Sequence, residues 1–277
     1  MGMLTEYYLQ PDAPDPVLSE PEVLRCVRRF VAGARAVTAV DESGGEARTY
    51  VIDDALVLKV QRPQQVRVGT SLAREVFFLN QIADTASDLP VPRVLGYARE
   101  THLLEYNIQT RMPGVAIEKT ALAPERQTAA IFSVGRFLRR LHGLAQKPLR
   151  DSAHFPTDHT AADFKDRLGQ YFDLLSQRLD ASERPWPLQM RFADVRDRTL
   201  AALPASAELV ALHSNPGPPH AFVDPDTGRF HGLIDFADAY VSHPALDLWR
   251  WRRPAERAAA LAGYVADARV SDDFMRT

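Results

Sequence analysis

The sequence predicts an α+β protein of two lobes, in which a small lobe with an antiparallel sheet and one helix precedes a larger helical lobe. The length of 277 residues is enough for one large domain or for two lobes. Apolar residues make up 45% and charged residues 25%, as in folded globular proteins. The spacing of apolar residues changes from strand-like to helix-like after Pro113-Gly114. We therefore predict lobes at 1–111 and 112–277.

The small lobe is predicted to contain five strands and one helix. Runs of β-favouring residues mark the strands, at Arg35–Glu42, Arg48–Ile52, Leu56–Val60, Arg93–Arg99 and Leu103–Gln109. Ser43-Gly44-Gly45 separates the first two strands, because glycine permits the positive φ angles of a tight turn. Between the third and fourth strands, apolar residues recur at helical spacing, which predicts a helix over Ser71–Ala83.

Helical spacing of apolar residues dominates the large lobe. The longest such pattern runs from Ala130 to Leu144, and Pro124 is suited to the first turn of that helix. Further helices are predicted at Phe164–Leu179, Leu188–Leu203 and Pro254–Ala268. A proline-rich loop and a short strand, Arg229–Ile234, interrupt the helices. We expect the two lobes to meet at a cleft that holds the functional residues.

Charge and cysteine content exclude several classes of protein. The 33 basic and 36 acidic side chains give a net charge of −3, without the positive excess on which nucleic-acid binding depends. The single cysteine, Cys26, excludes an intrachain disulfide framework and is typical of a reducing compartment. The longest charge-free stretch, Leu209–Val223, contains three prolines and cannot be a spanning helix. We therefore expect a cytoplasmic protein with neither nucleic-acid nor membrane partners.

Lys59 is the first candidate functional residue, since the chain has only four lysines against 29 arginines. Strand alternation places it on the sheet face opposite Leu58 and Val60. Alone, it could be an edge lysine whose stem covers apolar surface. Glu75, however, borders the apolar stripe of the predicted helix and needs a cationic partner there. We predict that Lys59 and Glu75 form an ion pair that presents the ammonium group to phosphate oxygens.

Two other positions have the chemistry of a binding site. Asp235 lies between Ile234 and Phe236 at the end of an apolar strand, where a carboxylate needs a cation, a metal or a cluster of donors. We predict a metal ligand, and the alternative is a residue that closes the loop by accepting backbone N–H groups. The backbone at Gly44 and Gly45 could approach a phosphate, although two glycines between strands are also the mark of a simple hairpin.

The strongest motif lies between Ala211 and Phe236, ALHSNPGPPHAFVD followed by PDTGRFHGLIDF. It resembles the aminoglycoside phosphotransferase and choline kinase group, whose kinase-like fold carries a His-Gly-Asp-x-x-x-x-Asn loop and then an Ile-Asp-Phe or Ile-Asp-Trp strand end. Other segments resemble this family in order and spacing: VLKV with Lys59, LAREVFFL with Glu75, VPRVLGY at 91–97, TRMPG at 110–114, FLRRLHGL at 137–144 and PALDL at 244–248. The resemblance extends from Val37 to Leu248.

The resemblance implies a two-lobed protein-kinase-like fold and transfer of the ATP γ-phosphate to a hydroxyl group of a small molecule, with ATP and Mg²⁺ as cofactors. It implies that Lys59 and Glu75 grip the phosphates and that Asp235 binds the metal. Thr110 and Met112 fall where such folds meet adenine, unless this segment is an ordinary linker. His213 and Asp247 match positions that are structural in the family.

The loop departs from the family pattern. Asn215 stands where the family's aspartate orients the substrate hydroxyl and accepts its proton, and Ser214 replaces glycine. A carboxamide can orient a hydroxyl but cannot accept its proton, so a rate contribution of about 10²–10⁴ should be missing. His220 stands where the family's asparagine binds magnesium. Imidazole nitrogen is a poor ligand for Mg²⁺, so we expect this metal contact to be weak.

Three functional hypotheses follow. The first is a phosphotransferase of reduced activity, in which Asn215 orients the acceptor hydroxyl. The second is a catalytically inactive relative that binds a nucleotide or another metabolite. The third is a metal-dependent hydrolase using His213, His220, His231 and Asp235, which the wide spacing of these residues disfavours. Residues 112–277 carry 21 basic and 21 acidic side chains, so there is no acidic surplus to attract a polycationic aminoglycoside.

Overall fold

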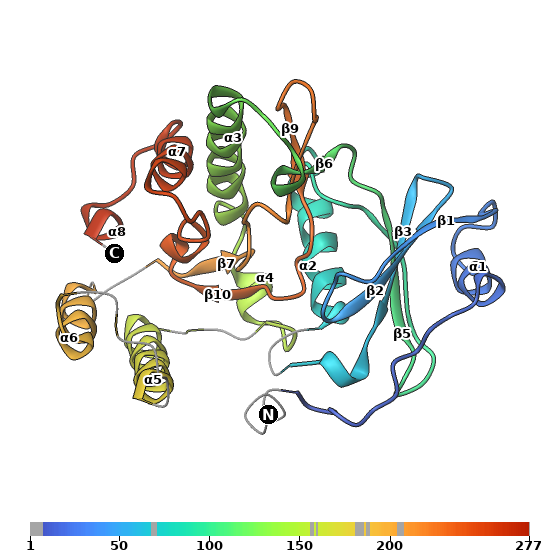
Figure 1. The fold of residues 1–277 in the computed structure, drawn as a ribbon, viewed down its shortest axis with the longest axis horizontal. Coiled ribbons are helices and arrows are strands. Elements are labelled where there is room, and N and C mark those ends of the chain that lie inside the picture. Colours follow the sequence, from blue (N-terminus) through green and yellow to red (C-terminus); the bar gives the residue numbers. More distant parts are fainter. Residues whose placement is uncertain are drawn as a thin grey trace.

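A computed structural model describes residues 8–67, 71–155, 158, 160–180, 186, 189–203 and 208–276. A small lobe built on a five-stranded antiparallel sheet is joined to a mainly helical large lobe (Figure 1). The predicted α+β, two-lobed fold class is therefore confirmed. Among the residues described, no helix has both the length and the apolar character needed to cross a membrane.

The sheet of the small lobe has the strand order β1-β2-β3-β5-β4. Its strands are β1 (Val37–Asp41), β2 (Ala47–Ile52), β3 (Leu56–Gln61), β4 (Val94–Arg99) and β5 (Glu105–Thr110). Each overlaps a strand predicted from the sequence. Lys59 of β3 lies between Thr49 of β2 and Asn107 of β5 in the ladder, so all three side chains share one face of the sheet.

Two helices lie on opposite sides of this sheet, α1 (Glu20–Arg28) and α2 (Leu72–Thr85) (Figure 1). Ser71 precedes α2 and caps it, since its side chain accepts the Ala73 N–H group. The predicted ends of this helix agree with the observed ends to within two residues. The prediction of one helix in this lobe was incomplete, because α1 was missed. The capping box formed by Ser19 and Glu22 is the sequence signal that would have located α1.

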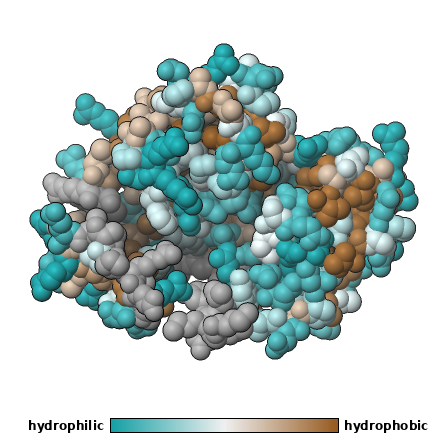
Figure 2. Space-filling view, in the orientation of Figure 1, coloured by the Kyte–Doolittle hydropathy of each residue, from teal (hydrophilic) through white to brown (hydrophobic). Residues whose placement is uncertain are grey.

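The side of the sheet that carries α1 holds a small hydrophobic core, in which sheet residues such as Leu58 and Ile108 are fully buried. α1 has only nine residues, and Phe30 beyond its end packs against Gly96 of β4 while remaining 39% exposed. Hydrophobic groups gather over the small lobe at the right of the view in Figure 2, whereas most of that face of the molecule is hydrophilic. The opposite side is covered by α2, whose Phe78 ring packs edge-on against Phe236 of the large lobe. α2 therefore couples the sheet to the large lobe.

The helices of the large lobe are α3 (Pro124–His142), α4 (Lys147–Arg150), α5 (Ala161–Asp180), α6 (Phe192–Ala202), α7 (Pro254–Val265) and α8 (Asp272–Arg276). The predicted helices correspond to α3, α5, α6 and α7, and α4 and α8 were not predicted. The predicted start of α6 at Leu188 lies outside the described residues. Short 3₁₀ turns are η2 (Pro63–Gln65), η3 (Ile117–Lys119) and η4 (Pro244–Asp247).

Short strands in the large lobe hold the loop that carries the strongest motif. β6 (Val115–Ala116), β8 (Ala221–Val223) and β9 (Phe230–Leu233) form one sheet, and β7 (Val210–Leu212) pairs with β10 (Tyr240–Ser242). Of these strands, only β9 was predicted. Residues 213–220 therefore run from β7 to β8, and Asp235 follows β9. The division into 1–111 and 112–277 stays a prediction.

Candidate functional site

Lys59 and Glu75 form the ion pair predicted from the sequence. The Lys59 Nζ atom lies 2.9 Å from Oε1 and 3.0 Å from Oε2 of Glu75. Glu75 is fully buried, and it also accepts hydrogen bonds from Asn107 Nδ2 (3.1 Å) and from the Phe236 N–H group (3.2 Å). The carboxylate is thus held by strands β3 and β5 and by the large lobe at once. Asn107 was missed by the sequence analysis, although strand alternation places it on the face of β5 that meets Lys59.

Asp235 of the large lobe completes this cluster. Its Oδ1 atom lies 2.8 Å from Lys59 Nζ, so one ammonium group bridges two carboxylates from different parts of the chain. Burial alone would raise the pKa of Asp235, but the Lys59 ammonium and His220 hold it well below its usual range. Burial alone would lower the pKa of Lys59, but Asp235 and Glu75 raise it above its ordinary value. Lys59 and Asp235 are therefore both charged at neutral pH.

The loop between β7 and β8 is anchored by Asp247, which is fully buried in η4. Asp247 accepts the N–H groups of His213 (2.8 Å) and Ser214 (2.7 Å), and His142 Nε2 lies 3.0 Å from the same carboxylate. The hydroxyl of Tyr264 in turn lies 2.9 Å from His142 Nδ1. Helices α3 and α7 thus position the loop through one carboxylate, in line with the structural role expected for Asp247.

The backbone at Ser214 adopts a conformation that favours glycine, the residue that the resembled motif has at this position. Its φ angle is +76°, a conformation that costs a residue with a β-carbon roughly 1–2 kcal/mol. The peptide is held there from both sides, since Ser214 N–H donates to Asp247 and its carbonyl accepts from Arg250 Nε at 2.9 Å. The loop therefore keeps the backbone shape of the motif despite the serine.

His213 is a buried, neutral histidine. Its Nε2 atom donates to the Ile234 carbonyl at 2.9 Å, and its Nδ1 atom accepts the Asn215 N–H group at 3.2 Å. Burial lowers the pKa of His213 to about 4. Protonation would place a hydrogen on Nδ1 as well and remove the acceptor for the Asn215 N–H group. The ring is thus a structural part of the loop, as expected from the sequence.

The lowered pKa of the buried His213 predicts that the folded protein loses stability in mild acid. The unfolded chain, with a histidine pKa near 6.5, binds a proton before the folded chain does, so stability falls as the pH drops from about 6.5 to about 4. The His213 contribution is at most about 3 kcal/mol. Urea unfolding of the wild type and of the His213→Gln variant at several pH values would measure it. We expect a flatter pH dependence for the variant, and parallel curves would contradict the prediction.

His220 connects the loop to Asp235. Its Nδ1 atom lies 2.7 Å from the Asn215 carbonyl oxygen, and its Nε2 atom lies 3.4 Å from Asp235 Oδ2. The two oxygens of Asp235 therefore face different partners, Lys59 on one side and His220 on the other. Asn215, the candidate for orienting a hydroxyl, is thereby brought into the same chain of contacts as Lys59, Glu75 and Asp235.

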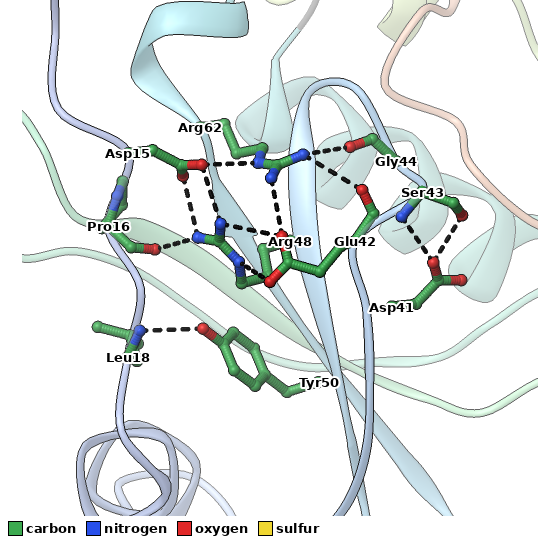
Figure 3. A network of polar contacts seen from close by, with 10 residues as sticks. All are labelled: Asp15, Pro16, Leu18, Asp41, Glu42, Ser43, Gly44, Arg48, Tyr50 and Arg62. Atoms are coloured by element: carbon green, nitrogen blue, oxygen red, sulfur yellow. Dashed lines mark hydrogen bonds and ion pairs between the residues drawn. The ribbon is translucent and has the colours of Figure 1, made fainter.

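The turn at Gly44 and Gly45 joins β1 to β2 and is held by arginines (Figure 3). Arg62 donates from Nη1 to the Gly44 carbonyl at 2.8 Å and from Nη2 to the Glu42 carboxylate at 3.0 Å. A β-carbon at Gly44 would lie 2.7 Å from the Ala47 carbonyl oxygen, so this close approach requires glycine. The turn thus has a defined shape, and its contact with a phosphate stays a prediction.

Arg48 is the centre of this arginine network (Figure 3). Its side chain is 4% exposed and makes two bonds of 2.9 Å to Asp15, while Nε donates to Glu42 at 2.9 Å. Burial alone would raise the pKa of Asp15, but Arg48 and Arg62 lower it. The network was missed by the sequence analysis, because its members come from segments far apart in the chain.

Thr110 is the last residue of β5, and Met112 lies in the connection between β5 and β6. Thr110 is fixed to the start of β4, since its Oγ1 atom accepts the Arg93 N–H group at 2.8 Å. Met112 is buried, and its methyl group would contact a β-carbon at Gly232 of β9. The two residues are therefore in a well-defined segment, and their contact with a nucleotide base stays a prediction.

The third hypothesis, a metal-dependent hydrolase, gains no support from this arrangement. Both ring nitrogens of His213 are engaged by the backbone, and His231 lies beside Gly114. In the described part of the chain, no three His, Cys, Asp or Glu side chains form a group that could hold a metal ion.

Comparison with known proteins links these features to a family. The model of the phosphotransferase enzyme family matches residues 37–276. A search of curated proteins returned no match. The family match includes every residue of the Lys59, Glu75, Asp235 and His220 cluster.

Solved structures of phosphotransferases have a similar fold. One is the ternary complex of streptomycin, ATP and APH(2")-IIa, with 17% identity, a TM-score of 0.59 and coverage of 90% of this chain and 83% of that chain. Another is the GDP complex of wild-type aminoglycoside 2'-phosphotransferase-IIIa, with 13% identity, a TM-score of 0.62 and coverage of 94% and 86%. A third is macrolide 2'-phosphotransferase MphH from Brachybacterium faecium, with 21% identity, a TM-score of 0.61 and coverage of 92% and 86%. At these identities the similarity concerns the fold.

Proposed function

The chain belongs to the phosphotransferase enzyme family, and on this premise we propose that it binds ATP between its lobes and slowly transfers the γ-phosphate to a hydroxyl group of a small molecule. The observation that carries the proposal is the cluster in which Lys59 Nζ lies within 3.0 Å of both Glu75 and Asp235. This cluster joins the sheet, α2 and the large lobe at one point.

Lys59 has the properties of a phosphate-binding group. Its ammonium is charged, its side chain is 14% exposed, and Glu75 holds it by two oxygens from the buried side. A triphosphate oxygen could replace Asp235 on the exposed side while Glu75 keeps its position. Phosphoryl transfer depends mainly on positioning and on neutralising phosphate charge, which a fixed ammonium group provides.

Asn215 would orient the acceptor hydroxyl and would not take its proton. The hydroxyl would lose its proton to water or to the phosphate during transfer, without the general-base contribution of about 10²–10⁴. The fixed loop, anchored through Asp247, supports the positioning part of this role. We therefore infer that the loop still positions the acceptor hydroxyl, and that transfer is slow because no side chain accepts its proton.

A magnesium ion fits this donor set poorly. Asp235 offers a carboxylate, but the group that faces it is the imidazole of His220 at 3.4 Å. Mg²⁺ prefers an octahedron of hard oxygen ligands. We therefore assign no step of the transfer to a magnesium ion.

The replacement of the loop aspartate and asparagine favours a second candidate, a catalytically inactive protein that binds a nucleotide. The relatives compared above include complexes with ATP and GDP, so either candidate would use a nucleotide. For the acceptor, the equal numbers of basic and acidic side chains in residues 112–277 favour a molecule other than a polycation.

Thermal unfolding with and without nucleotide tests the binding part of the proposal. A ligand at 100 times its Kd stabilises a protein by about 2.7 kcal/mol. We expect ATP to raise the Tm by roughly 5 °C or more, and adenosine, which lacks phosphates, to raise it much less. A Tm unchanged at millimolar ATP, with and without divalent ions, would remove the nucleotide from the proposal.

A further inference from the structure

Arg250 follows η4 and lies against the loop that carries Asn215. Its Nε atom donates to the Ser214 carbonyl oxygen at 2.9 Å, and a β-carbon at Gly217 would lie 3.6 Å from the Arg250 Cβ atom. The guanidinium group lies over the indole ring of Trp249, with its Cζ atom 4.6 Å from the ring centroid. One hydrogen bond and one aromatic ring thus fix this cation beside the residue proposed to orient the acceptor hydroxyl.

The Arg250 guanidinium is not engaged in an ion pair. In the part of the chain that the structure describes, no Asp or Glu carboxylate lies within ion-pair distance of it, and its hydrogen bond to Ser214 uses Nε alone. Burial raises the pKa of the Asp238 carboxyl group, and Arg250 opposes this effect from a distance, whereas Arg67 is in contact with Asp238 at 3.4 Å. Both Nη groups of Arg250 therefore keep their N–H donors for an anion.

A guanidinium group held in this way is suited to a carboxylate or a phosphate. Its planar fork donates two parallel N–H groups to two oxygens of one oxyanion. Stacking on Trp249 fixes the plane of the fork and leaves its edge free. The Trp249 side chain is itself 54% exposed, so it also offers a flat apolar surface to a ligand. A ligand amine, by contrast, would be repelled by Arg250.

We propose that Arg250 binds an anionic group of the acceptor, so that the substrate is a small molecule that carries both a hydroxyl group and a carboxylate or phosphate group. The hydroxyl would lie at Asn215 and the oxyanion at the Nη groups of Arg250. Because Ser214 and Asn215 are consecutive, one small molecule can reach both groups. This inference rests on the proposed phosphoryl transfer and goes beyond it by naming the class of acceptor.

Three probes of nearly the same shape separate charge from shape. At neutral pH, 4-hydroxybenzoate is an anion, 4-hydroxybenzamide is neutral and 4-hydroxybenzylamine is a cation, and each has a hydroxyl group on a flat ring. Titration calorimetry would measure their affinities for the wild type, with and without ATP. Because hydrogen bonds to charged groups are the stronger ones, we expect the acid to bind at least about 10-fold more tightly than the amide, and the amine most weakly.

Substitutions of Arg250 test whether this residue causes the preference. Arg250→Gln removes the charge and should bind the acid and the amide equally well, whereas a damaged loop would lose both ligands. Arg253→Gln, the same substitution at a side chain that is 77% exposed, is the matched control and should keep the preference. Arg250→Lys keeps the charge without the planar fork, and it serves as a second variant in which the preference should be smaller.

The outcomes distinguish this inference from the proposed nucleotide binding. Equal binding of the three probes by the wild type, or binding of none, overturns the acceptor class whatever ATP does. An acid preference that is unchanged in both Arg250 variants overturns it as well. If Arg250→Gln weakens the binding of ATP and not that of the acid, Arg250 binds the nucleotide, and the acceptor assignment is wrong. If the acid preference is found but ATP does not raise the Tm, the anion site stands and the proposed nucleotide binding fails.

Discussion

Replacing Lys59 with methionine is expected to abolish the stabilisation of the protein by ATP and to lower the free energy of unfolding by about 3–5 kcal/mol. The reason is that Glu75 is fully buried and Lys59 is its cationic partner, at 2.9 Å. Removing the ammonium group leaves a buried carboxylate without a counter-charge, next to Asp235. Urea unfolding would measure the loss of stability, and thermal unfolding with ATP would measure the loss of binding.

A double variant separates these two effects. In Lys59→Met with Glu75→Gln, the unpaired charge is removed, so much of the stability should return while ATP binding stays absent. Lys147→Met is the matched control, because the Lys147 side chain is 85% exposed, and it should change neither quantity. If the double variant regains the ATP-induced rise in Tm, Lys59 is a structural residue and does not grip phosphate.

Replacing Asn215 with aspartate is expected to increase phosphoryl transfer from ATP by about 10²–10⁴, which corresponds to a barrier lower by about 3–6 kcal/mol. The backbone of this residue is already positioned, since its N–H group donates to His213 and its carbonyl accepts from His220. The substitution therefore adds a proton acceptor without rebuilding the loop. ADP release over a panel of hydroxyl-bearing acceptors would measure the gain.

Asn80→Asp, at an exposed position of α2, introduces the same charge elsewhere and should leave the rate unchanged. The combination of Asn215→Asp with His220→Asn restores both family residues and tests whether an amide at 220 increases the rate in Mg²⁺. A wild-type rate already as high as that of the variant would show that the loop needs no carboxylate. Activity in none of these variants, together with ATP binding, would favour the catalytically inactive candidate.

Local patterns were enough to predict most of the small lobe. Runs of β-favouring residues located all five strands, and the i, i+3 and i+4 spacing of apolar residues located α2 and α3. α1 was missed because its apolar face is short and follows a proline-rich segment. Most of the short strands of the large lobe were missed for another reason. A strand of two or three residues, such as β6 or β7, has no periodicity of its own and forms only because a distant partner is present.

The sequence predicted the part of the site in which a buried charge needed a partner of opposite charge. Glu75 on an apolar helix face required a cation, and Lys59 was the candidate at the right place. The contact of Lys59 with Asp235 spans 176 positions in sequence, and no local pattern predicts it. The orientation of His220 was not predictable, because it depends on where the Asn215 carbonyl points after the loop is anchored by Asp247.

The anchoring of Arg48 by Asp15 has a practical consequence for where the folded unit begins. The family match starts at residue 37, yet a shortened polypeptide that begins there would leave a guanidinium that is 4% exposed without the carboxylate that binds it at both Nη atoms. Arg48 would keep its bonds to Glu42 but lose both bonds to Asp15, which would lower the free energy of unfolding. Minimal versions made for crystallisation or labelling should therefore keep the residues from Asp15 onward, although sequence matching alone would discard them.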